Sequence, residues 1–215
     1  MFINTRAFTS YTITSVDLDK GEMVIDGKYT ITLALKSLYN IYNILSAYTV
    51  ASIIGIDGEK IARDMSDYVL KNGRVITFEL KSRKGTLLTS KHENSVSYDQ
   101  SIRVASACKE GCDVMFIVDA VSRKYFTSDV SWLYDIDFEM LNNENIGEII
   151  LSGRYFNDLA ARFSYTDIPS EKIRIIPEIE KAVDYLDSDR KEYIYVITCF
   201  SDKGKFLEKL KGDKR

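Results

Sequence analysis

The sequence predicts an α/β fold: a mostly parallel sheet with flanking helices, preceded by a smaller segment made of a hairpin and helices. Two observations lead to this prediction. Beyond residue 72, short apolar runs alternate with segments in which apolar residues recur at helical spacing, and four of these runs are nearly continuous in apolar character. Strands covered on both faces have this character, and strand–helix–strand alternation gives parallel sheets with right-handed crossovers. Before residue 72 the pattern differs, so we expect two domains, residues 1–71 and 72–215.

The first part begins with strand-like residues. Residues 11–33 alternate in the manner of strands and are interrupted by turn residues at Asp19-Lys20-Gly21 and Ile25-Asp26-Gly27, which predicts a hairpin. Apolar residues then recur at helical spacing from Ser37 to Ile54 and from Gly58 to Leu70. These patterns predict the hairpin-plus-helices segment.

The second part contains six short apolar runs, which we predict to be strands. The runs are Val75–Leu80, Thr86–Thr89, Val114–Val118, Ile149–Leu151, Ile173–Ile176 and Tyr193–Thr198. Three helical stripes lie between them. The stripes consist of Tyr98, Ile102 and Ala105, then Phe156, Leu159, Ala160 and Phe163, and finally Ile179, Ala182, Val183 and Leu186. This alternation is Rossmann-like.

Composition excludes several classes of protein. The 215 residues include 29 basic and 32 acidic side chains, and the pI is near 5.4, so no electrostatic footprint for nucleic acid is present. Three cysteines are an odd number, which argues against a disulfide framework and favours a reducing compartment. The start lacks the pattern of a signal peptide, and polar residues interrupt the apolar stretch Ile41–Ile56. We therefore expect a cytoplasmic protein without membrane insertion.

The most distinctive segment runs from Asp129 to Glu139. It holds the only tryptophan, Trp132, and four carboxylates within eleven positions. Carboxylates so close together repel one another, bind a cation or orient a base on another group. The alternative is structural: Asp129 or Ser131 would cap a helix whose first turn carries the acids.

The ends of the predicted strands supply a second group of candidates. Ligands bind outside the carboxyl ends of strands in such sheets, which points to Asp119, to the segments after Ile176 and Thr198, and to Gly153 with Arg154. A glycine at a helix start suits an anion. The structural alternative is a ladder of charges, because Arg154, Asp158 and Arg162 share one face of the predicted helix.

Metal and nucleotide sites are disfavoured. Cys108 and Cys112 could form half of a zinc site with Cys199 and His92, but no second paired motif accompanies them, so we predict no metal. The sequence contains neither a G-x-x-x-x-G-K-[ST] phosphate loop nor a G-x-G-x-x-G motif after a strand. We therefore expect no cofactor on this chain.

Two segments resemble the MurT family, the Mur-ligase-like subunit of lipid II isoglutaminyl synthase. Residues Asp129–Glu139 resemble the family's D-V-S-W-[IL]-W-D-x-D-F-E, and residues Ser152–Tyr165 resemble its s-G-x-R-x-x-D-x-A-x-R-[LF]-x-Y. The resemblance extends from about residue 29 to the end. It implies a Mur ligase C-terminal-like fold for residues 72–215 and a remnant of the Mur-ligase-like central domain for residues 1–71.

The resemblance also implies a role in amidation of the D-glutamate of lipid II during peptidoglycan synthesis. In the family, ammonia comes from GatD, a class I glutamine amidotransferase, and the C-terminal domain docks on it and supplies an aspartate to its triad. Asp135 and Asp129 match that aspartate, with Asp135 favoured. The resemblance marks further binding residues. These are Trp132, Asp137, Gly153, Arg154, Asp158, Arg162 and Lys91.

The sequence departs from the family in its ligase features. The phosphate loop and the four-cysteine zinc ribbon have no counterpart here, so ATP and Mg²⁺ are implied only for the family part that this sequence lacks. A separate Mur-like ATPase chain is then a second implied partner. The family's K-N-P-[AT]-G reads Lys91-His92-Glu93-Asn94-Ser95. We expect a chain that is inactive alone, and the alternative is a non-catalytic interaction or ligand-binding module derived from the Mur ligase fold.

Overall fold

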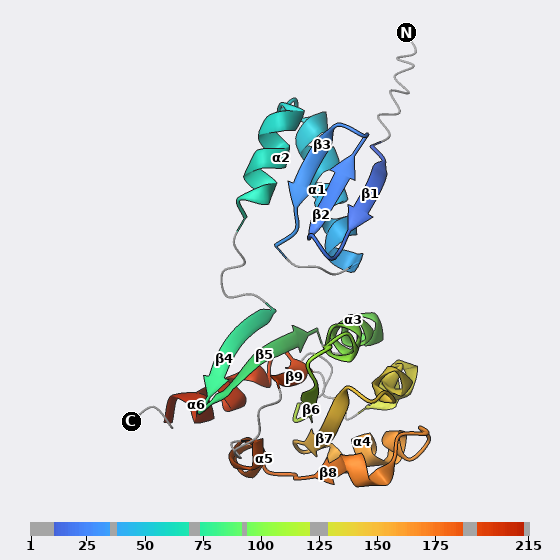
Figure 1. Ribbon diagram of the computed structural model, residues 1–215, viewed down its shortest axis with the longest axis vertical. Coiled ribbons are helices and arrows are strands. Elements are labelled where there is room, and N and C mark those ends of the chain that lie inside the picture. Colours follow the sequence, from blue (N-terminus) through green and yellow to red (C-terminus); the bar gives the residue numbers. More distant parts are fainter. Residues whose placement is uncertain are drawn as a thin grey trace. The chain divides into compact units, whose positions relative to one another are not determined.

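The computed structural model describes residues 11–34, 38–68, 74–91, 94–120, 129–186 and 193–212. Contacts divide the chain into two compact units, Met1–Lys71 and Asn72–Arg215. Figure 1 shows the elements of each unit. Within the described residues, no helix is long and apolar enough to cross a membrane.

The first unit is a three-stranded antiparallel sheet with two helices. Its elements are β1 (Ile13–Asp17), β2 (Glu22–Ile25), β3 (Tyr29–Thr32), α1 (Leu38–Ile53) and α2 (Gly58–Ser66). The predicted hairpin is thus extended to two successive hairpins, and the second turns through Asp26 and Gly27, both with positive φ. Both helices are confirmed, although α2 ends before Leu70, which lies outside the described residues.

The second unit is built on a six-stranded sheet. Its strands are β4 (Val75–Leu80), β5 (Arg83–Ser90), β6 (Cys112–Ile117), β7 (Ile146–Ser152), β8 (Ile173–Ile175) and β9 (Tyr193–Cys199), in the order β4-β5-β9-β6-β7-β8. Only β4 is antiparallel to its neighbour, and the other four pairings are parallel. The predicted α/β fold with a mostly parallel sheet is therefore confirmed, and each predicted run forms a strand.

Helical segments cover both faces of this sheet (Figure 1). One face carries α3 (Ser95–Ser106), α4 (Phe156–Phe163) and the 3₁₀ turns η1 (Ser131–Asp135) and η2 (Phe138–Leu141), and the other carries α5 (Ile179–Leu186) and α6 (Lys203–Gly212). A third 3₁₀ turn, η3 (Ser170–Lys172), precedes β8. The helix α6 has no counterpart in the sequence prediction.

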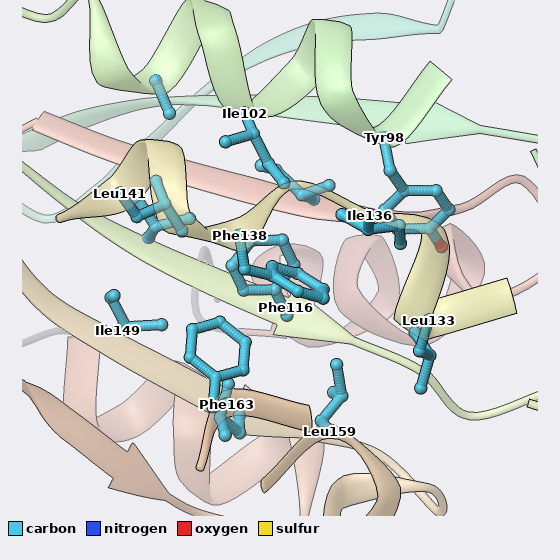
Figure 2. Packing of buried hydrophobic residues seen from close by; sticks show 14 of the residues in the cluster. Tyr98, Ile102, Phe116, Leu133, Ile136, Phe138, Leu141, Ile149, Leu159 and Phe163 are labelled. Carbon is cyan, nitrogen blue, oxygen red and sulfur yellow. The ribbon is translucent and has the colours of Figure 1, made fainter. Parts of the chain in front are cut away.

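An aromatic cluster forms the core beneath η1, η2 and α4. The Phe138 ring packs against Phe163 with centroids 4.6 Å apart and against Phe116 of β6 at 5.1 Å. Figure 2 shows these rings between β6 and α4, with Leu133 and Ile136 beside them. All five side chains are buried. The segment that contains the tryptophan is therefore anchored by its own apolar residues.

A buried ion pair joins β5 and β6, the two strands on either side of β9. The Arg83 guanidinium lies 2.6 Å from the Asp113 carboxylate, and both side chains are at most 2% exposed. Arg83 also donates to the Leu186 carbonyl at the end of α5, and Asp113 accepts the Glu148 backbone N–H. The pair thus connects β5, β6, β7 and α5, and nothing in the sequence pattern predicts it.

Candidate functional site

The carboxyl ends of β6, β7 and β8 meet at one edge of the sheet. There Gly153, which follows β7, lies against Val118 and Pro177, the residues just beyond β6 and β8. Its backbone N–H donates to the Pro177 carbonyl at 2.9 Å. Its φ is +95°, and a Cβ at this position would lie 2.6 Å from the Val118 carbonyl oxygen. Because L side chains rarely adopt this backbone conformation, Gly153 is required by the packing of the strand ends.

Asp119 connects three elements at the same edge. Its carboxylate accepts the backbone N–H of Arg154 at 3.0 Å and is paired with the Lys205 ammonium of α6. The hydrogen bond between Lys205 and the Asp119 carboxylate raises the pKa of Lys205 above its ordinary value. The buried carboxylate of Asp202 accepts the backbone N–H groups of Asp119 and Ala120. The start of the segment after β6 is therefore fixed by carboxylates.

An open cleft of about 940 Å³ lies beside these residues. Its lining consists of Asp119, Gly153, Arg154, Phe156, Pro177, Glu178, Ile179, Glu180, Lys205, Glu208 and Lys209. Cations and carboxylates alternate in this lining, so the cleft favours neither an anion nor a cation. Arg154 is exposed and its guanidinium lies 5.8 Å from the centre of the Tyr155 ring. Lys91, exposed at the end of β5, does not line this cleft.

The segment Asp129–Glu139 does not start a regular α-helix; it forms η1, and η2 begins within it. The Asp129 carboxylate accepts the Ser131 backbone N–H at 2.8 Å, which closes the turn before η1. This hydrogen bond is the main reason that the pKa of Asp129 is lowered. Asp129 therefore has the structural role that the sequence left open, with 3₁₀ turns in place of the expected helix.

Trp132 is a core residue. It is 7% exposed, and its ring centroid lies 5.1 Å from that of Tyr98 in α3. The indole N–H is buried and has no hydrogen-bond partner among the residues that the structure describes. Burial raises the pKa of the neighbouring Tyr98 well above its ordinary value, so this hydroxyl stays neutral. Trp132 therefore does not present its ring to a ligand.

The side chain of Arg162 in α4 holds the segment Asp129–Glu139 in place. Its guanidinium donates to both carboxylate oxygens of Glu139, at 2.9 and 2.8 Å, and to the Ile136 carbonyl at 2.8 Å. The pairing with Arg162 lowers the pKa of Glu139. The expected charge ladder with Arg154 and Asp158 is therefore wrong, because the buried Arg162 reaches across to η2.

Asp135 and Asp137 have exposed side chains. The Asp137 backbone N–H donates to the Asp99 carboxylate of α3 at 2.9 Å, which holds the link between the two turns. Asp135 lies at the end of η1, between the buried Leu133 and Ile136. Within the described part of the chain, its carboxylate has no hydrogen-bond or ion-pair partner.

Tyr134, which directly precedes Asp135 in the chain, forms an exposed pair with Tyr165. Tyr134 is 53% exposed and Tyr165, which follows α4, is 75% exposed. Their rings meet edge to face with centroids 6.1 Å apart. Sequence reasoning missed this pair of tyrosines, because the two residues lie far apart along the chain and belong to different motifs.

Asp158, another of the predicted binding residues, is half-buried on α4, one turn before Arg162.

Cys108 and Cys112 lie close enough to interact, but Cys199 is not near them. Cys112 begins β6 and Cys199 ends β9, and since these strands are parallel neighbours the two thiols lie at opposite edges of the sheet. Burial raises the pKa of both thiols, that of Cys199 to about 12, so both are held neutral. No group of three or more potential ligands for a metal occurs among the described residues, and His92 lies outside them.

Solved structures identify the fold as that of Mur ligases. MurF from Acinetobacter baumannii matches 94% of this chain and 44% of its own length, with a TM-score of 0.67 and 14% identity. MurC from Thermotoga maritima matches 94% of this chain and 46% of its own length, with a TM-score of 0.61 and 9% identity. At these identities the likeness concerns the fold alone.

Sequence comparison then gives the family. The MurT ligase C-terminal family matches residues 92–202, just over half of the chain. The chain belongs to this family. The MurT subunit of lipid II isoglutaminyl synthase from Streptococcus pneumoniae is 28% identical over 194 residues, which cover 89% of this chain and 42% of that subunit. MurT from Staphylococcus aureus strain COL is 27% identical over 191 residues, 86% of this chain and 40% of its own length. The chain thus spans less than half the length of these relatives.

Proposed function

We propose that this chain takes part in the glutamine-dependent amidation of the D-glutamate of lipid II by docking a GatD-like glutaminase and supplying an aspartate to its triad. Membership of the MurT C-terminal family supports the reaction class. The relatives are named subunits of a glutamine-hydrolysing synthase, and a reaction of that kind needs a second subunit or domain that releases ammonia from glutamine.

The observation that carries the proposal is the Asp135 carboxylate. It is exposed at the end of η1, while Leu133 and Ile136 on either side are fully buried and fix the backbone. A carboxylate that accepts the N–H of an imidazole fixes the tautomer of that ring and stabilises its protonated form. Asp135 has the exposure that this role requires, and no residue that the structure describes pairs with its carboxylate oxygens.

Asp129 is the weaker candidate for the same role. One of its oxygens already accepts the Ser131 backbone N–H, and the turn before η1 depends on this bond. An imidazole would have to compete with the backbone for that carboxylate. We therefore assign the triad position to Asp135 and the capping role to Asp129.

The proposal leaves ATP to another polypeptide segment. This chain spans about two fifths of its MurT relatives, and its sequence has no phosphate loop. A Mur-like ATPase, on a separate chain or elsewhere in the same polypeptide, would bind ATP and Mg²⁺ and activate the carboxyl group in the cytoplasm. The chain is then not a ligase by itself.

Glutamine hydrolysis tests the proposal. The chain is mixed with the GatD-like class I glutaminase from the same organism, and glutamate release is measured. Asp135→Asn should lower the rate by about 10²- to 10⁴-fold, the effect of removing a triad carboxylate elsewhere. Asp184→Asn, on α5 at the other face of the sheet, is the matched control and should leave the rate unchanged. Full activity of the Asp135 variant would refute the triad role and favour a non-catalytic interaction module.

A further inference from the structure

The edge-to-face pair of Tyr134 and Tyr165 is an exposed aromatic surface with a rigid support. The two side chains are 53% and 75% exposed, yet their rings contact each other with centroids 6.1 Å apart. Tyrosine is enriched at protein interfaces because it offers a large contact area and loses little conformational entropy on binding. Mutual contact restricts both rings further before any partner arrives.

One residue, Arg162, holds the two tyrosines in register. Its side chain donates to the Ile136 carbonyl, two residues after Tyr134, and pairs with Glu139. Its backbone carbonyl accepts the N–H of Tyr165 at 3.2 Å. Since Arg162 is buried, the relative position of the rings is set by the core and not by the surface. Such a preorganised aromatic pair is a suitable anchor for a binding partner.

The charge around the pair specifies the kind of partner. The segment Asp129–Glu139 carries four carboxylates and no basic residue. Glu139 is neutralised by Arg162, which leaves Asp129, Asp135 and Asp137 exposed in the segment that contains Tyr134. A second copy of the same surface or a nucleic acid would be repelled. A protein surface with arginine, lysine or protonated imidazole groups is complementary.

We propose that Tyr134 and Tyr165 are the anchor on which the GatD-like glutaminase docks, and that the anchor holds the partner's imidazole against Asp135. The inference rests on the proposed function, which it deepens by separating two roles. The tyrosines determine affinity, and Asp135 determines the hydrolysis rate of the complex once it has formed. The two roles predict different measurements.

Binding and catalysis are measured separately with the full chain and the glutaminase from the same organism. Tyr134→Ala and Tyr165→Ala should each raise Kd by about 30-fold, the effect of losing an interface hot spot. Hydrolysis at saturating concentrations of either variant should stay within about threefold of the wild-type rate. Asp135→Asn should show the reverse: hydrolysis is lost and Kd changes little. Association of the wild-type chain should slow as salt increases.

Controls separate docking from folding. Tyr134→Phe and Tyr165→Phe keep the ring contact and should bind within about threefold of the wild type. Tyr68→Ala removes a tyrosine of similar exposure, 59%, from the first unit and should leave Kd unchanged. Near-ultraviolet circular dichroism of the alanine variants should retain the wild-type signal of the core. A phenylalanine variant that binds as weakly as the alanine variant would overturn the role of the ring contact.

The outcomes distinguish the two proposals. One outcome is that a variant with both Tyr134→Ala and Tyr165→Ala binds with wild-type affinity while Asp135→Asn abolishes hydrolysis. The tyrosine anchor is then overturned and the proposed function stands. If the tyrosine variants lose affinity while Asp135→Asn hydrolyses glutamine fully, the anchor stands and the triad role fails. If the wild-type chain does not bind the glutaminase at all, both fail.

Discussion

Gly153 illustrates how single residues determine the geometry of the sheet edge. With φ at +95° and the Val118 carbonyl oxygen 2.6 Å from where a Cβ would lie, the position admits only glycine without rearrangement. The sequence marked Gly153 as a binding residue because it precedes a helix. The structure shows a second reason for a glycine there, namely the close approach of two strand ends. A glycine singled out as a binding residue can therefore have a packing role.

Replacement of Gly153 by alanine should destabilise the protein. Strained backbone and the clash with β6 together predict a loss of about 2–3 kcal/mol in the free energy of unfolding. Urea denaturation measures this loss. Gly204→Ala in α6 is the matched control: nothing lies within 4 Å of its Cβ position, and helical alanine should be neutral or stabilising. Equal effects of the two substitutions would contradict the strain argument.

The ion pair of Arg83 and Asp113 predicts a second residue-scale effect. Both side chains are fully buried, so removing one partner leaves the other charge in the interior without its ion pair. Asp113→Ala should cost about 3–5 kcal/mol in the free energy of unfolding. Asp64→Ala, which breaks the exposed pair of Lys60 and Asp64 in α2, should cost less than about 1 kcal/mol. Thermal unfolding of both variants checks the contrast.

At the scale of elements, strands were predictable and the 3₁₀ turns were not. The six residues of β6 are all buried, which explains its continuous apolar run. In η1, η2 and the link between them, the buried positions are Trp132, Leu133, Ile136, Phe138 and Leu141, a spacing that fits neither a helix nor a strand. Their burial depends on Phe116, Phe163 and Arg162, which lie elsewhere in the sequence. The exposed position of Asp135 follows from that packing. The local sequence pattern could therefore indicate Asp135 as a candidate residue but could not predict that its side chain is exposed.

The helix α6 was missed for a similar reason. Among the residues of α6 whose burial is described, Phe206 and Leu210 are buried, and both fill a core formed with α5. Three apolar residues, Phe206, Leu207 and Leu210, among several lysines give a weak helical signal. The contact of Lys205 with Asp119 at the cleft was therefore also not visible from sequence.

The ion pair between Glu139 of η2 and Arg162 of α4 should make the free energy of unfolding depend on pH in the acidic range. Arg162 lowers the pKa of Glu139, so the folded state binds a proton on this group less readily than the unfolded state. The resulting stability is fully present above the unfolded-state pKa and is lost as the pH falls through the folded-state pKa. Between about pH 5 and pH 3 the wild type should lose stability more steeply than Glu139→Gln. Urea midpoints across this range test it, and superimposable curves would contradict it.

At the scale of the whole molecule, the two compact units have separate cores. Every residue of the proposed docking surface belongs to the unit Asn72–Arg215, whose core includes both faces of the six-stranded sheet. The first unit has a separate core around Ile25, Ile31 and Tyr48. Independent cores are the usual mark of units that fold separately.

A fragment that begins at Asn72 should therefore fold alone. We expect a single cooperative unfolding transition in calorimetry and a Kd for the glutaminase within about threefold of that of the full chain. A fragment without a cooperative transition would show that the first unit is needed for folding. A folded fragment with much weaker binding would show that the first unit contributes to docking.

The position of β9 has a consequence for biosynthesis. This strand follows the other five strands of the sheet along the chain but lies between β5 and β6, so it joins two halves of the sheet. Until the ribosome has released Tyr193–Cys199, β5 and β6 each present an unpaired apolar edge. Two exposed strand borders on the nascent polypeptide thus favour aggregation until β9 inserts between them.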